Sequence, residues 1–136
     1  MNRVRGFSLL ELMIAVAVIA ILVAVAYPSY QRQMARGARA DAHSALAAIA
    51  NRQEQYFYDH RSYTNSTKAL GFAASYLTDG GHYLITLAAP DSGSLKTGFV
   101  ATATAQGGHA SRDAGCLTLT INALGERGGT SADCWR

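Results

Sequence analysis

The stretch GFSLLELMIAVAVIAILVAVAYPSY, residues 6–30, decides the fold of this 136-residue chain. No Asp, Glu, Lys or Arg occurs from Leu12 to Gln31, and most of that run consists of Leu, Ile, Val, Met and Ala. As a helix, residues 7–27 would be about 31 Å long at ~1.5 Å per residue, which matches a bilayer core of roughly 30 Å. We therefore predict one membrane-spanning helix that begins close to the N-terminus.

The segment before this helix differs from a secretory signal peptide. Its basic part is reduced to Arg3 and Arg5, and the apolar run that follows is too long and carries a carboxylate, Glu11, near its start. Arginines flank the span on both sides, so the positive-inside rule does not orient it. The two cysteines, Cys116 and Cys134, permit one disulfide, which favours an exported C-terminal part and a cytoplasmic N-terminus.

Glu11 is the informative residue of the span. An ionised carboxylate costs roughly 2.5–3.5 kcal/mol at the centre of a bilayer and less near one end. One interpretation is that Glu11 lies at the helix start, reaches the interface and meets the positive end of the helix dipole. The other is that its carboxylate pairs with a positive charge of another subunit.

Type IV prepilins carry an N-terminal signal that the string GFSLLELMIAV, residues 6–16, resembles. The resemblance implies a leader of residues 1–6, cleavage by a prepilin peptidase between Gly6 and Phe7, and N-methylation of Phe7. It also implies that Glu11 pairs with the charged amine of Phe7 on an adjacent subunit during assembly, and that Pro28 bends the helix. At about 4 Å and an effective dielectric constant near 20, such a pair attracts by roughly 4 kcal/mol before desolvation is subtracted.

Two further segments resemble the same family. Cysteine pairs like Cys116 and Cys134 enclose the C-terminal D-region of type IV pilins, and a bond here would close a loop of about 19 residues and contribute around 3 kcal/mol. The stretch EQYFYDHRSYT, residues 54–64, and the Cys134-Trp135 ending resemble the PilE-like minor pilins.

Beyond Pro28 the pattern becomes amphipathic and predicts that the helix continues to about Tyr58. Alternating side chains and turn residues predict strands over 83–88, 98–105 and 116–122. The intervening segments are expected to form a helical turn at 66–70, a loop at 107–115 and a turn at 125–130.

These elements together predict an α+β chain with the type IV pilin fold. The amphipathic half of the long helix is expected to pack on a small antiparallel sheet of three to four strands. The expected domains are the leader 1–6, the transmembrane and assembly helix 7–28, and a globular headgroup 29–136.

The charged residues give no broad basic surface of the kind that dedicated nucleic-acid-binding domains carry, because the formal net charge is only +3. Three arginines, Arg32, Arg36 and Arg39, fall near one helical stripe. We expect them to meet lipid headgroups or acidic groups of neighbouring subunits.

The sequence contains no catalytic or metal-binding pattern. The histidines have no ligand spacing to other His, Cys, Asp or Glu residues, and no serine stands in a nucleophile elbow. We therefore expect no enzymatic activity, no cofactor and no metal site. Solvated or locally bonded side chains are expected for His43, His60, His82 and His109.

The sequence favours a structural protein, a minor pilin of a type IV pilus. We expect a single-pass protein of the inner membrane that joins an extracellular pilus and supports pilus biogenesis, twitching motility or adhesion. Its expected partners are other pilin subunits, prepilin peptidase, the inner-membrane assembly machinery and inner-membrane lipid. Two alternatives stay open: a type II secretion pseudopilin, against which the cysteine pair and the lack of a calcium-binding acidic cluster argue, and a minor pilin that binds DNA during uptake.

Overall fold

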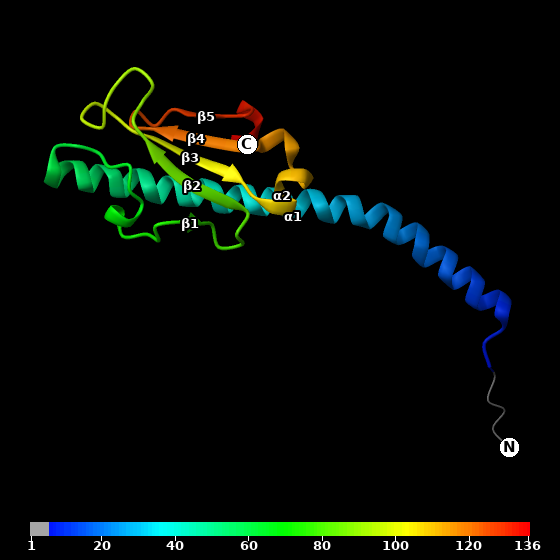
Figure 1. Cartoon of the computed structure of the whole chain (residues 1–136). Coiled ribbons are helices and arrows are strands. Elements are labelled where there is room, and N and C mark those ends of the chain that lie inside the picture. Colours follow the sequence, from blue (N-terminus) through cyan, green and yellow to red (C-terminus); the bar gives the residue numbers. More distant parts are fainter. Residues whose placement is uncertain (1–5) are drawn as a thin grey trace. The chain divides into compact units, whose positions relative to one another are not determined.

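A computed structural model describes residues 6–136. The chain divides into two compact units with the boundary between Met34 and Ala35. The helix α1, Leu9–His60, contributes to both units and ends two residues beyond the predicted Tyr58 (Figure 1).

The first unit consists, in its described part, of the approach to α1 and the apolar half of that helix. All residues from Gly6 to Tyr30 are exposed in the single chain. By length and composition alone, α1 can cross a membrane. Pro28 lies inside the helix.

The second unit contains an antiparallel sheet in which sequence neighbours pair in the order β1-β2-β3-β4-β5. The sheet has five strands, which corrects the expected three to four. Its strands are β1 (Tyr76–Leu77), β2 (Tyr83–Ala88), β3 (Val100–Ala105), β4 (Thr118–Asn122) and β5 (Arg127–Gly129).

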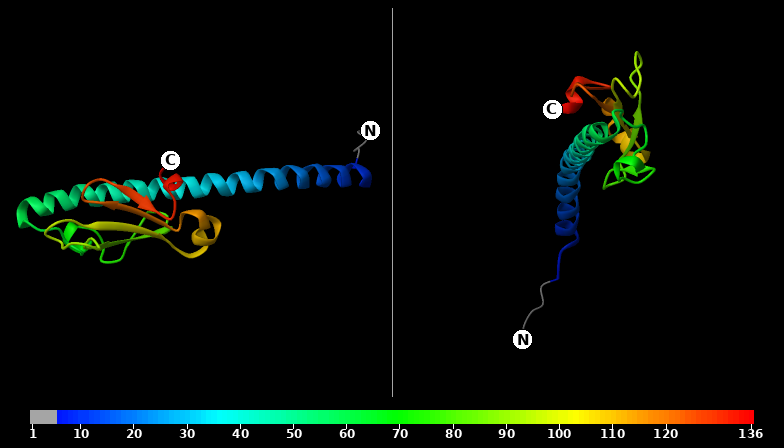
Figure 2. Two further views of the ribbon diagram at one scale, coloured as in Figure 1. Left: turned by 90° about the horizontal axis from the view of Figure 1, so that it is seen from above. Right: turned by 90° about the vertical axis from the view of Figure 1, so that its left-hand side faces the viewer.

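The core of the second unit forms where alternate strand residues face the amphipathic stripe of α1. Figure 2 shows the part of α1 that belongs to this unit, from Ala35 to His60, running along one face of the sheet. Strands β2 and β4 contribute large side chains to this core, whereas the buried residues of β3 are alanines. The buried set includes Ala38, Ala42, Leu46, Ile49, Tyr83, Ile85, Ala101, Ala103, Leu119 and Ile121.

The prediction of a loop over 107–115 was wrong, because this segment forms the helix α2 (Gly107–Arg112) and the 3-10 helix η2 (Ala114–Cys116). Two more 3-10 helices occur, η1 (Lys68–Leu70), within the predicted helical turn, and η3 (Ala132–Trp135).

The turn predicted over 125–130 contains the edge strand β5. Its Gly129 has φ +136°, and a Cβ there would lie 2.1 Å from the carbonyl oxygen of Thr118. Glycine is therefore required for β5 to approach β4, which explains why a Gly-rich stretch forms a strand here.

Candidate assembly site and disulfide-bonded headgroup

The predicted cleavage site lies just before α1. Gly6 and Phe7 have no regular secondary structure, and Phe7 is 83% exposed. Residues 1–5 of the predicted leader lie outside the described residues. The peptide bond between Gly6 and Phe7 is therefore accessible to a protease in the single chain.

Ser8 caps the start of α1. Its Oγ accepts a hydrogen bond from the backbone N–H of Glu11 at 3.2 Å. The spacing Ser8-Leu9-Leu10-Glu11 is that of a capping box, a sequence pattern that would have identified Ser8 before the structure did. Glu11 thus lies in the first turn of α1, where the helix dipole favours a negative charge.

The apolar half of α1 presents a continuous hydrophobic surface. Its large side chains, such as Leu9, Ile14 and Val25, are about half exposed or more. A shallow apolar groove of about 350 Å³ is lined by Leu12, Met13, Val16, Ala17 and Ala20. Exposed apolar surface of this extent marks a site that lipid or other protein chains cover.

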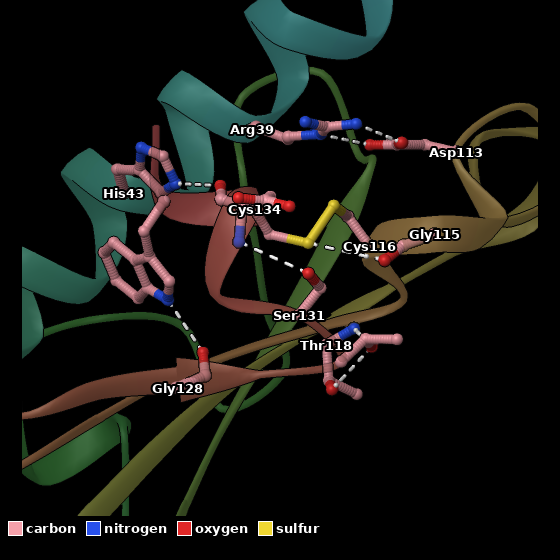
Figure 3. The surroundings of a disulfide bond; sticks show 12 residues. Arg39, His43, Asp113, Gly115, Cys116, Thr118, Gly128, Ser131 and Cys134 are labelled. Carbon is pink, nitrogen blue, oxygen red and sulfur yellow. Dashed lines mark hydrogen bonds and ion pairs between the residues drawn. A yellow bond between two sulfur atoms is a disulfide. The ribbon is translucent and has the colours of Figure 1, made fainter.

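A disulfide joins Cys116 at the end of η2 to Cys134 in η3, with Cα atoms 5.6 Å apart. Cys134 is fully buried. Figure 3 shows the carbonyl oxygen of Cys134 facing His43 of α1, whose Nε2 lies 2.9 Å away. The disulfide therefore holds the C-terminal segment beside the end of η2, and the contact with His43 holds it beside α1.

Trp135 continues this closure. Its ring stacks on His43 with centroids 4.5 Å apart, and its Nε1 donates to the carbonyl oxygen of Gly128 at 2.7 Å. The guanidinium of Arg127 lies 5.1 Å from the centroid of the same ring. The indole thus links α1, β5 and η3. The sequence pattern identified Trp135 only as part of the Cys-Trp ending and predicted none of these contacts.

A buried ion pair connects α1 to the segment after α2. Arg39 donates two hydrogen bonds, of 2.6 and 2.5 Å, to the carboxylate of Asp113, which is 6% exposed (Figure 3). The hydrogen bond to Asp113 raises the pKa of Arg39. The expectation that Arg39 meets lipid or a neighbouring subunit was therefore wrong, since its partner lies 74 residues away in the same chain.

His109 lies beside this pair and is 3% exposed. Its Nε2 has no hydrogen-bond partner among residues 6–136 and lies 3.8 Å from Asp113. The ring packs on His82 and Tyr83. Burial lowers the pKa of His109, and His82, Arg112 and Arg39 lower it further, whereas Asp113 acts in the opposite direction. A solvated or locally bonded side chain was predicted here, and for His109 this was wrong.

The burial of His109 predicts that the headgroup is less stable in acid. The pKa of His109 is lower in the folded chain than its value of about 6.5 in an unfolded chain. Below about pH 6.5 the unfolded state then binds more protons, so stability falls as the pH drops through the folded pKa. Urea unfolding between pH 7.5 and pH 5 is expected to show this loss, and His109→Gln should reduce it. The exposed His60→Gln is the control, and an unchanged pH dependence in His109→Gln would contradict the assignment.

Comparisons with known proteins agree with these features. The family model described as "Type IV minor pilin ComP, DNA uptake sequence receptor" matches residues 28–120. A second model, the prokaryotic N-terminal methylation motif, matches residues 1–27. Together they cover the predicted processing site, α1, the strands β1 to β3 and the first part of β4.

Curated relatives point to the same family. Fimbrial protein EcpC of Eikenella corrodens is 30% identical over 130 residues, which cover 96% of this chain and 81% of that protein. The type IV major pilin protein PilA of Myxococcus xanthus (strain DK1622) is 39% identical over 71 residues, 52% of this chain. The chain spans only 32% of the length of that major pilin.

The fold also has a solved counterpart. A type IV pilin from Shewanella oneidensis superposes with a TM-score of 0.55 at 22% identity and covers 75% of this chain and 98% of that one. This likeness supports the α+β fold with its long N-terminal helix and antiparallel sheet. From the matched family models and the full-length relative, we conclude that the chain belongs to the type IV pilin family and is a minor pilin.

Proposed function

We propose that this chain is inserted in the inner membrane as a single-pass precursor and is then built into an extracellular type IV pilus. Prepilin peptidase removes the leader 1–6 by cutting between Gly6 and Phe7, and Phe7 is N-methylated. Residues 7–28 form the transmembrane and assembly helix, and residues 29–136 form the headgroup. The filament supports pilus biogenesis, twitching motility or adhesion.

One observation carries this proposal: the apolar half of α1 is exposed along its whole length in the single chain. Such a surface needs lipid before assembly and other pilin helices afterwards. Moving from lipid to a bundle of apolar helices gains little hydrophobic free energy, so close packing and the pairing of Glu11 with a neighbouring Phe7 amine set the register. A contact that repeats without closing produces a helical filament.

The mature N-terminus tests this proposal directly. Chains recovered from sheared pili are expected to have a mass that begins at Phe7 with one added methyl group. Precursor from cells that lack the peptidase serves as the control and should begin at or next to Met1. A chain that retains residues 1–6 in the pili, or that is absent from them, would contradict the proposal.

A second candidate function is DNA binding during uptake. It is favoured by one observation, the description of the matching family model as a DNA uptake sequence receptor. The headgroup also carries exposed cations, among them Arg112, Arg127 and Lys96. Full-length chain in phosphatidylcholine nanodiscs is expected to retain labelled DNA on a filter at low salt if this function is correct. Absence of retention at low salt, with empty nanodiscs as the background, would rule it out.

A further inference from the structure

The α2 segment, residues 107–115, is attached to the rest of the second unit chiefly through two buried side chains. Asp113 binds Arg39 of α1 (Figure 3), and the ring of His109 packs on Tyr83 of β2. The other residues of the segment are half-buried or exposed. The backbone is bonded locally, since the N–H of Asp113 donates to the carbonyl oxygen of His109 at 2.9 Å. These two side chains therefore decide whether the segment stays in place.

The two ends of the α2 segment are fixed independently of those side chains. Before it, Gln106 donates its backbone N–H to the carbonyl oxygen of His82 at 2.8 Å. After it, the disulfide holds Cys116 to Cys134. Gly107 at the start of the segment has φ +53°, a conformation that glycine adopts without strain. The segment can therefore move about its ends while the sheet stays intact.

The buried ring of His109 has no acceptor for a second N–H group. Its Nε2 makes no hydrogen bond within the part of the chain that the structure describes, 6–136, and it lies 3.8 Å from Asp113. Both oxygens of that carboxylate already accept hydrogen bonds from Arg39. An imidazolium donates from both ring nitrogens, so the closed segment suits the neutral ring and not the protonated one.

The surroundings of this ring also oppose a positive charge. Burial is the main cause of the lowered pKa of the histidine; Asp113 raises this pKa, whereas His82 directly before β2, Arg112 on α2 and Arg39 on α1 lower it. The hydroxyl of Tyr83, whose ring contacts the histidine, stays uncharged because burial raises its pKa to about 12. In an open segment water would solvate the histidine, and its pKa would return to about 6.5.

We propose that the α2 segment is an acid-sensitive flap, which opens about its fixed ends when His109 is protonated while the sheet and the disulfide stay intact. Opening gives the imidazolium access to water. Because Asp113 moves with the segment, opening also uncovers the guanidinium of Arg39, so this surface gains positive charge only in acid. The loss of stability in acid is then limited to the free energy that opening the flap costs. This inference does not depend on assembly into pili.

Hydrogen–deuterium exchange measured by mass spectrometry tests the flap in the full chain in phosphatidylcholine nanodiscs, at pH 7.5 and pH 5. Exchange times are scaled to the intrinsic amide exchange rate at each pH. A six-residue helix does not persist in water without tertiary contacts, so the amides of α2 exchange once the flap opens. Protection of the α2 segment is expected to fall several-fold at pH 5. The limit is about thirtyfold, set by protonation of an open-state histidine with a pKa of about 6.5. Peptides from β2 and β3 should keep their protection.

Three variants separate His109 from other effects of acid. His109→Phe keeps an aromatic ring beside Tyr83 but cannot take up a proton, so its α2 segment should stay protected at pH 5. His60→Phe makes the same change at an exposed histidine and should behave like the parent chain. Asp113→Asn weakens the attachment to Arg39 and should lower the protection of the α2 segment already at pH 7.5.

Three results would each overturn the flap. The first is unchanged protection of the α2 segment in the parent chain at pH 5. The second is an equal loss in β2 and β3, which would mean that the whole headgroup unfolds. The third is the same acid response in His109→Phe as in the parent chain. The first two comparisons use the parent chain alone, so they hold even if a variant does not fold.

Discussion

Glu11→Ala is expected to enter the membrane as well as the parent chain but to be incorporated into pili about tenfold less, or even more weakly. In a bundle of apolar helices, the change leaves the Phe7 amine of a neighbour without its counter-charge. A tenfold change in incorporation corresponds to about 1.4 kcal/mol. The attraction between the two charges, roughly 4 kcal/mol before desolvation is subtracted, is larger than this. The helix start should persist, because Ser8 binds the backbone N–H of Glu11 and not its side chain.

The measurement compares the amount of chain in the membrane fraction with the amount in sheared pili. Glu11→Gln separates the loss of charge from the loss of side-chain volume and should behave like Glu11→Ala. Glu126→Ala, an exposed acid of the headgroup, is the matched control and should assemble normally. Equal incorporation of Glu11→Ala and the parent chain would show that the Glu11 pair does not set the register.

Asp113→Ala is expected to lower the free energy of unfolding of the headgroup by about 3 kcal/mol. This is the lower end of the roughly 3–5 kcal/mol observed when one partner of a buried pair is removed. Asp113 is 6% exposed, whereas the side chain of Arg39 is 23% exposed and can turn partly toward water once its partner is gone. The change also disconnects the segment after α2 from α1.

Trp135, the single tryptophan of the chain, reports this unfolding through its fluorescence in urea titrations of the full chain in mild detergent. Asp133→Ala is the matched control. Its ion pair with Arg136 is exposed, with 75% and 83% of the two side chains accessible, so no measurable change is expected. Similar midpoints for Asp113→Ala and Asp133→Ala would show that the buried pair contributes little to stability.

The sequence predicted those parts of the fold that depend on local periodicity. Strand β2 was predicted with its observed bounds, because Tyr83, Ile85 and Leu87 alternate with residues that face outward. The long helix was predicted because an amphipathic stripe follows the apolar run on the far side of Pro28. In both cases neighbouring residues carry the information.

The parts that sequence analysis missed depend on contacts between distant residues. Arg39 and Asp113 are 74 residues apart, and no local pattern connects them. The segment containing α2 was predicted to be a loop, but the structure ties it to α1 through Asp113 and packs His109 on Tyr83. Strand β5 depends on the backbone of β4, which requires glycine at position 129.

The alanine layer between α1 and β3 constrains how this protein can diverge in evolution. Ala38 and Ala42 on the helix and Ala101 and Ala103 on the strand are almost completely buried in one cluster. A bulkier residue at any of these buried positions would overpack the core and strain the contact between helix and sheet. Variation among descendants should therefore accumulate on the outer face of the sheet and in its connections, while this layer stays nearly invariant.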